Sequence, residues 1–466
     1  MKKIINYILL LSLPALFGAC KKYLEKPPEG NIEESIALKS ETDVKAVINS
    51  CYIKLGNDGI YSGNLQRTAE MLADHLDGSN LNGKPQEIYL RRTTIFNTDN
   101  AGLFTDLYNT IYRVNKALEN LALVTADKDK VDGEAKFIRA ICHFEVARLW
   151  SHNPGFTNDD SHPGITIKTS SAISVPQRST VKETYEKIIS DLKDAESKLP
   201  DFNENRLNAD KNAARAFLAK VYFQMNKFSE AYNYADLVIK SNHYSLAGDL
   251  TSRYTPAGST EAILRISNVL GQHEPGGSLR GGFSGRNGLP FLRFSKSVYD
   301  FVKSQTGDQR LAWLDGDKFS GNVYLTKYDA SNFELPVVFL TEMLLIRAEA
   351  GGEIGTAESV AAGVSDINKI IERAYGNSSK NLSVNTSASL LINKVREQRE
   401  IEMVGENGDR LHEIKRIGAH PNAARRIERL DRRGSEWNCP GFILQFPDYE
   451  KNANAAFQLN VEGGCL

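Results

Sequence analysis

Apolar residues recur at helical spacing through much of this 466-residue chain. Between 104 and 121 they fall at steps of three and four, which places them on one face of a helix. The same pattern predicts helices over 137–149, 181–199, 213–225, 230–240, 337–350, 360–374 and 390–403. Short β-type runs occur only at 262–267 and 323–328. We therefore predict a mainly α fold with a few short strands.

The predicted helices come in pairs. Leu218, Ala219 and Tyr222 are followed nine residues after the tyrosine by Ala231, a spacing that matches the first part of a tetratricopeptide repeat. A second pair is predicted within 344–374, joined at Gly351-Gly352. Because no regular period connects the pairs, the pattern indicates a degenerate tetratricopeptide-like scaffold instead of a regular solenoid.

Long, polar, glycine-rich segments separate the pairs at 57–100, 151–177 and 255–289. Loops of this length are uncommon in compact proteins unless they serve a function or are disordered. Binding residues are often carried on loops that a rigid scaffold positions. We predict these segments to be irregular and expect a ligand site among them.

The chain opens with Lys2 and Lys3, an apolar run over 4–17, two small residues and Cys20. The run is shorter than the roughly 20 residues that a spanning helix needs, and it is typical of a secretory signal. The segment that ends in this cysteine resembles a bacterial lipoprotein signal, in which Cys20 would be lipidated and become the new N-terminus. A plain signal peptide with an incidental cysteine is the alternative. We assign 1–19 to the signal and 20–35 to a tether.

The balance of charges argues against one class of function, and the cysteines are predicted to be either buried thiols or candidates for a disulfide. Lys+Arg number 57 and Asp+Glu 58, so nucleic-acid binding, which needs a basic stripe, is not expected. Cys51 and Cys142 lie in helix-like apolar patterns and are predicted to be buried thiols. Cys439 and Cys465 lie in a chain whose leader permits disulfides, and whether they pair is left open.

Seven segments in order resemble the SusD/RagB family of outer-membrane lipoproteins. They read YLEKPPEGNI, LFTDLYNTIYRVNKALENL, EAKFIRAICHFEVARLW, DKNAARAFLAKVYFQMNKFSEA, LTEMLLIRAEA, REIEMVGENGDRLHEIKRIG and FPDYEKNANAAFQLN. Ile417 replaces a usual tryptophan, and Ala453 to Ala456 replace a proline region. The resemblance implies a SusD-like N-terminal helical region over 36–225 and a C-terminal RagB/SusD region over 226–466 that includes a variable loop subdomain.

The resemblance also implies a function. Members hold glycans, or in some cases peptides, over a SusC-like TonB-dependent transporter and act as a hinged lid without catalysis or cofactors. Fatty-acyl (palmitate-type) chains would anchor this chain to the outer membrane, facing outward. Lys21 and Lys22 stand where acidic residues are frequent in exported lipoproteins, so a periplasmic orientation stays open. A peptide ligand, or a protein-interaction scaffold without a small ligand, are the alternatives.

A pyranose ring has an apolar face that packs on aromatic side chains, and its hydroxyls need polar partners. Loop aromatics and nearby polar residues are therefore the candidates for ligand contact. For each of them the sequence favours the alternative of a packed or solvated loop residue, since single exposed aromatics need no explanation. The candidates are Tyr61, Tyr89 and Phe283, with Asp74, His75, Asn80 and Arg286 as hydrogen-bonding partners. Trp150 and Trp313 are expected in the core.

Charged residues within the family segments are expected to be structural. Arg139, Glu349, Glu402 and Arg410 should form ion pairs that connect neighbouring helices, because buried charges need partners. No Gly-x-Ser-x-Gly, His-Glu-x-x-His or phosphate-loop motif is present, which argues against an enzyme. The loop with His152, Asp159, Asp160 and His162 could hold a metal, but its composition favours a polar turn.

Overall fold

The computed structural model describes residues 38–255, 258–267, 275–284, 290–316, 321–330, 332–427 and 430–465. The predicted signal, Cys20, the tether and Arg286 lie outside these ranges. Within them, helices dominate and strands are few and short, which confirms the predicted fold class.

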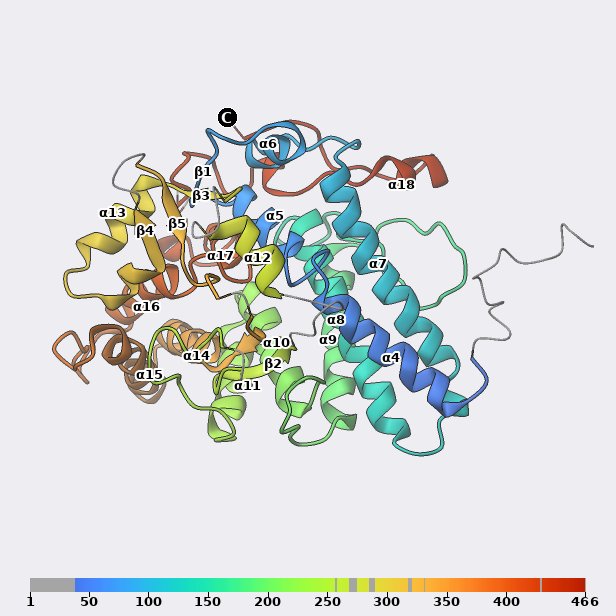
Figure 1. Ribbon diagram of the computed structural model, residues 1–466, viewed down its shortest axis with the longest axis horizontal. Helices are drawn as coiled ribbons and strands as arrows, with labels where there is room; N and C mark the ends of the chain where they lie inside the picture. Colours follow the sequence, from blue (N-terminus) through green and yellow to red (C-terminus); the bar gives the residue numbers. More distant parts are fainter. Residues whose placement is uncertain are drawn as a thin grey trace, which may run out of the picture.

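Helices on one side of the molecule form an antiparallel succession that reaches into its centre (Figure 1). Each packs on the next along the chain. In order they are α4 (Glu41–Gly56), α7 (Thr98–Glu119), α8 (Lys128–Trp150), α9 (Val181–Lys198) and α10 (Lys211–Gln224). Between α8 and α9 the chain is irregular through 151–177, as predicted.

The succession continues across the molecule, where α10 pairs with α11 (Phe228–Lys240), and α11 packs on α14 (Leu340–Ile354). Helix α14 then contacts both α15 (Ala357–Tyr375) and α16 (Ala388–Glu402). Helix α17 (Asp409–Gly418) follows and contacts α10. These pairs confirm the tetratricopeptide-like arrangement. The predicted boundary at 225/226 falls in the turn that joins α10 to α11, and it stays a prediction.

Local signals start and stop these helices. Ser40 and Thr180 each form a capping box. The side-chain oxygen of the cap accepts from the backbone N–H of the third helical residue, and the carboxylate of that residue, Asp43 or Glu183, accepts from the backbone N–H of the cap. Helix α14 ends at Gly355, whose φ of 75° belongs to the left-handed region that glycine occupies without strain.

In the part of the chain that the structure describes, two small sheets accompany the helices (Figure 1). Strands β1 (Leu76–Asp77), β3 (Arg293–Phe294), β5 (Val323–Leu325) and β4 (Leu314–Gly316) pair in that order, all antiparallel. Strand β2 (Ala262–Ile266) pairs antiparallel with β6 (Leu335–Phe339), directly before α14. The remaining helices are short: α5 (Asn64–Leu72), α6 (Gly83–Tyr89), α12 (Pro275–Phe283), α13 (Lys296–Ser304) and α18 (Asp448–Ala453).

Four sequence predictions of local structure are wrong. The helix predicted over 337–350 begins as β6 and becomes helical only at Leu340, because both elements are buried on all sides and an apolar run fits either. The predicted loop over 57–100 contains α5 and α6, and 255–289 contains α12. Helix α14 continues through Gly351-Gly352, where a Cβ on Gly351 would lie 2.4 Å from the Ser359 carbonyl oxygen. These glycines permit close helix packing and do not form the turn.

The signature charges form buried ion pairs between elements, as predicted. Arg139 on α8 holds Asp191 of α9 at 2.8 Å, and Arg410 binds Asp74 at 2.7 Å. Glu349 lies 2.8 Å from Arg396 of α16. These pairs bridge neighbouring helices or join distant parts of the chain.

Glu402 is the centre of a buried network that includes three arginines. Its Oε1 lies 2.6 Å from Arg253, with Arg373 on the same oxygen, and its Oε2 lies 3.1 Å from Arg310. Lys327 completes the network by donating to the Glu402 carbonyl at 2.7 Å and to the Glu406 carboxylate at 2.6 Å. The arginines hold the pKa of Glu402 well below its usual value, against the effect of burial.

The C-terminal segment returns to the first helices. Asn460 donates to the carbonyls of Trp150 and Leu444, and Trp150 is fully buried as expected. Cys439 and Cys465 form a disulfide with a Cα–Cα distance of 5.5 Å, which settles the pairing. Cys51 and Cys142 are buried free thiols, as predicted.

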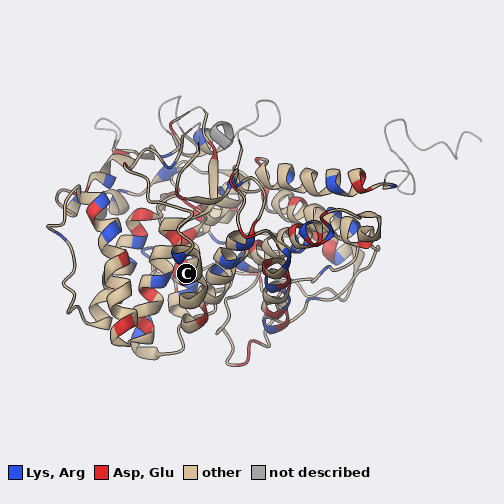
Figure 2. Cartoon of the chain, turned by 90° about the horizontal axis from the view of Figure 1, so that it is seen from below, with Lys and Arg blue, Asp and Glu red and all other residues tan. Residues whose placement is uncertain are grey.

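Charges of both signs alternate along the described helices (Figure 2). In the same residues, no helix combines the length and hydropathy that crossing a bilayer requires.

Candidate functional site

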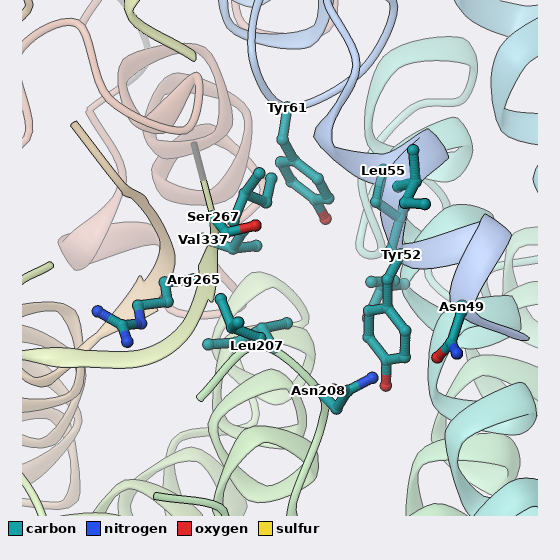
Figure 3. A pocket seen from close by; sticks show the side chains of 13 residues that line it. Asn49, Tyr52, Leu55, Tyr61, Leu207, Asn208, Arg265, Ser267 and Val337 are labelled. Carbon is teal, nitrogen blue, oxygen red and sulfur yellow. The ribbon is translucent and has the colours of Figure 1, made fainter. Parts of the chain in front are cut away.

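A cavity of about 190 Å³ lies between α4 and the β2–β6 ribbon. It brings together segments that are far apart in sequence: α4, the turn after it, α8, the turn before α10, and both strands (Figure 3). Its lining residues are Asn49, Tyr52, Ile53, Leu55, Tyr61, Ile141, Leu207, Asn208, Leu264, Arg265, Ile266, Ser267 and Val337.

Two tyrosines border the cavity, and their hydroxyls are engaged on the protein. The Tyr61 hydroxyl donates to Glu145 Oε1 at 3.1 Å, and the Tyr52 hydroxyl accepts from the Ala209 amide at 2.9 Å. Figure 3 shows Tyr52 extending from α4 toward Asn208, with Tyr61 reaching in from the neighbouring turn. These bonds fix both ring positions. Tyr61 is only 3% exposed, so the half-buried Tyr52 ring is the one that offers accessible, preorganised apolar surface.

Polar groups surround this apolar lining. Asn49 is exposed and Asn208 is half-buried, and neither side-chain amide has a hydrogen-bond partner among the described residues. Arg265 contributes a guanidinium that is fixed by Glu334 at 2.5 Å and by the Asn205 carbonyl at 3.0 Å. An apolar pocket with a few placed polar groups is the usual form of a small-molecule site.

Tyr61 is the one sequence-predicted candidate, among those the structure describes, that lines this cavity. Asp74 and His75 are 2% and 1% exposed, and Phe283 is fully buried. Direct ligand contact is therefore not available to these three side chains in this structure, and they are packed residues, which is the alternative that the sequence favoured.

Each buried candidate has a structural role. Asp74 is held by Arg410, which keeps its pKa well below the usual value although burial acts in the opposite direction. His75 lies between Glu70 and Glu400, at 3.6 and 3.5 Å, and these carboxylates outweigh burial and raise its pKa to about 9. Phe283 ends α12 and packs 5.7 Å from the ring of Tyr328.

Asn80 and Tyr89 keep partial exposure but lie outside the cavity. Asn80 donates to the Phe291 carbonyl at 3.0 Å, and the Arg433 guanidinium covers one face of Tyr89 at 4.1 Å. Their role in ligand contact stays a prediction.

Sequence reasoning missed Tyr52, Asn49 and Asn208. The helical stripe of α4 is visible at Val44, Ile48 and Cys51, all buried. Tyr52 follows that stripe by one position, which places it at the edge of the apolar face. The sequence therefore indicates a boundary residue, but only the tertiary structure brings Asn208 to it.

We find no candidate metal site among the described residues. The described residues include no group of three or more histidine, cysteine or acidic side chains placed to hold an ion. In the loop considered for a metal, His152 instead stacks on Phe156 with ring centroids 4.0 Å apart.

Comparison with known proteins adds the evolutionary context. A family model described as "Starch-binding associating with outer membrane" matches residues 22–223, and the model of the "SusD family" matches 316–460. SusD-like protein P2 of Formosa agariphila is 25% identical over 475 aligned positions, covering 89% of this chain and 90% of that protein.

Solved structures share the architecture. A SusD superfamily protein of Bacteroides thetaiotaomicron superposes with a TM-score of 0.79 at 21% identity, covering 91% of this chain and 100% of the other. A SusD-like carbohydrate binding protein of Bacteroides vulgatus gives a TM-score of 0.68 at 17% identity, covering 81% and 84%. At such identities the likeness establishes the fold alone. The two family models, the SusD-like relative and the order of the family segments together show that the chain belongs to the SusD/RagB family.

Proposed function

We propose that this protein binds glycan at the outer membrane and passes it to a partner TonB-dependent transporter, without chemical conversion. The observation that carries the proposal is the tyrosine-bordered cavity on a SusD-type fold. The preorganised Tyr52 ring suits the apolar face of a sugar, and the amides of Asn49 and Asn208 suit its hydroxyls.

Family membership supports the location. The matching N-terminal model describes association with the outer membrane, and the sequence places a cysteine after a signal-type segment. In this proposal Cys20 carries the acyl chains, and more than one chain makes the anchoring stable. The transporter partnership and the lid role are the family's mode of action applied to this chain.

The binding step is tested with the mature chain on native affinity gels that contain starch, xylan, mannan or β-glucan, and by calorimetry with a casein peptide digest. Retardation by at least one polysaccharide is expected. Retention of peptides alone would favour the peptide-binding alternative, and new reducing ends in the glycan would contradict a purely binding function.

Tyr52→Ala should weaken glycan binding about tenfold, because a preorganised ring that packs on the sugar is lost. Tyr52→Phe should retain most of the affinity, since the face of the ring stays in place. Tyr112→Ala is the matched control, because Tyr112 is 46% exposed on α7 and does not line the cavity. Equal affinities for Tyr52→Ala and the control would place the site elsewhere.

A further inference from the structure

A second cavity, of about 210 Å³, adjoins the first along α4. It is lined by Lys45, Ile48, Asn49, Asp127, Lys130, Val131, Glu134 and Asn208. Asn49 and Asn208 line both cavities, so the two spaces meet at this pair of amides.

One face of α4 connects the two spaces. Lys45, Ile48, Asn49 and Tyr52 stand at steps of three and four, which aligns their side chains along the helix. The stripe changes from a charged residue through an amide to an aromatic ring. The groove is thus polar at the Lys45 end and apolar at the Tyr52 end.

Glu134 is the unusual residue of the polar cavity. Its side chain comes from α8, it is 6% exposed, and its Oε1 has no hydrogen-bond partner among the described residues. A buried carboxyl without a partner costs stability, so its presence at a cavity wall points to a partner that binds from outside.

The charges around Glu134 are balanced. Lys130 lies on the same helix, and Lys45 faces it from α4 together with the Tyr52 ring. Asp127 faces it from the turn before α8. Lys45 is already engaged by Glu41 at 2.7 Å and by Asp127 at 3.5 Å, so the cavity carries no large excess of either sign.

We propose that this polar cavity is a second subsite of the same groove, in which a neutral, hydroxyl-bearing sugar unit binds to Glu134, Asn49 and Asn208 while the adjoining unit packs on Tyr52. The inference rests on the proposed glycan-binding function. A hydroxyl can accept from a protonated carboxyl and from the two amides, whereas a charged sugar would meet charge of its own sign from Lys45 and Lys130 or from Asp127.

The subsite makes binding depend on pH. Burial, together with the smaller effect of Asp127, raises the pKa of Glu134 to about 7, against the opposing effects of Lys130 and Lys45. A sugar hydroxyl that accepts a hydrogen bond from the carboxyl O–H favours the protonated form. Affinity should therefore fall as pH rises through 7, by about three- to tenfold for one hydrogen bond.

The test is calorimetry of the mature chain with neutral trisaccharides (maltotriose, cellotriose, xylotriose and mannotriose) at pH 5.5 and 8.5. The wild type should bind at least one of them several-fold more tightly at pH 5.5. Glu134→Gln should bind with the same affinity at both pH values, and Asn208→Ala should be weaker at both. Asp129→Asn, an exposed acid on the same helix and outside the cavity, should behave as the wild type.

The possible failures are distinguishable. If Tyr52→Ala loses binding but Glu134→Gln keeps the wild-type affinity and pH dependence, the subsite inference is overturned and the proposed function stands. Binding only of glucosamine or galacturonate oligomers would overturn the neutral-sugar assignment. If the wild type binds no trisaccharide and no polysaccharide, both proposals fall. Thermal melting of each variant shows whether it is folded.

Discussion

Glu134 and Glu402 are both buried glutamates on helices, but their surroundings are opposite. Glu402 is contacted by three arginines, and Glu134 has an Oε1 without a partner. The pKa of Glu402 is held well below its usual value, whereas that of Glu134 is raised to about 7. The fold thus satisfies the Glu402 carboxylate where it joins α16 to the central loops, and leaves Oε1 of Glu134 without a hydrogen-bond partner where a cavity opens.

This contrast helps to separate structural charges from candidate binding groups. Burial alone does not distinguish them, since Glu402 is fully buried and Glu134 nearly so. The distinguishing property is whether the protein itself satisfies the carboxylate. Charges that connect helices are paired within the fold, and a carboxylate left unsatisfied at a cavity wall is available to a ligand.

Removing the charge at Glu402 should have the largest effect on stability. Glu402→Gln leaves Arg253, Arg310 and Arg373 with an uncompensated buried charge, and should destabilise the fold by about 3–5 kcal/mol. Urea unfolding measures this difference. Glu397→Gln is the control and should stay near the wild type, because Glu397 on the same helix contacts none of these arginines: its Oε1 pairs with Lys394 and accepts from the Gln398 amide, which a glutamine oxygen can still accept. A loss below about 1 kcal/mol at Glu402 would contradict a central structural role.

Glu134→Gln should have a smaller effect that depends on pH. The raised pKa means that the folded state holds a proton which the unfolded state releases above about 4.5. The stabilisation is therefore present at low pH and is lost as pH rises through 7. Relative to the wild type, the glutamine variant should gain about 2 kcal/mol between pH 5 and pH 8.

Urea midpoints measured for both proteins across this range provide the comparison. At each pH, the free energy of unfolding of the wild type is subtracted from that of the variant. The contributions of groups that titrate identically in both proteins then cancel. Parallel curves would show that Glu134 has a partner in the fold, which would remove the contrast with Glu402.

An exposed ion pair gives the lower reference for both experiments. Lys296 and Asp300 pair on α13 with side chains 76% and 51% exposed. Lys296→Met should change stability by less than about 0.5 kcal/mol, because solvent screens the pair. A larger loss would mean that exposed charge pairs also stabilise this fold, and the effect at Glu402 would then need a different interpretation.

Periodicity predicted most of the scaffold because its helices each have a buried stripe. It failed where an element is buried on every side, as at the junction of β6 and α14 at Leu340. It also failed for α5, where Leu65, Ala69 and Leu72 form a buried stripe only nine residues long, within a glycine-rich stretch. In both places the pairing partners that decide the structure are distant in sequence.

The site was less predictable than the fold. The signature charges were expected to pair, and Arg139 and Glu349 do so, because a buried charge in a helix-packing motif needs a partner wherever that partner lies in the sequence. A cavity has no such local signal: Tyr52 and Asn208 meet only because α4 and the turn before α10 both pack beside β2. Asp74 and His75 appeared to be loop residues, since the sequence does not show that Arg410 and Glu400 enclose them.

The disulfide between Cys439 and Cys465 has a consequence for how the protein withstands proteases. A cut in the exposed stretch around α18 would leave the released piece covalently attached, and Asn460 would still be held against Trp150. Such nicked molecules would run as intact chains on a gel until a reductant separates the fragments. Damage at this exposed edge would therefore leave the helical scaffold assembled.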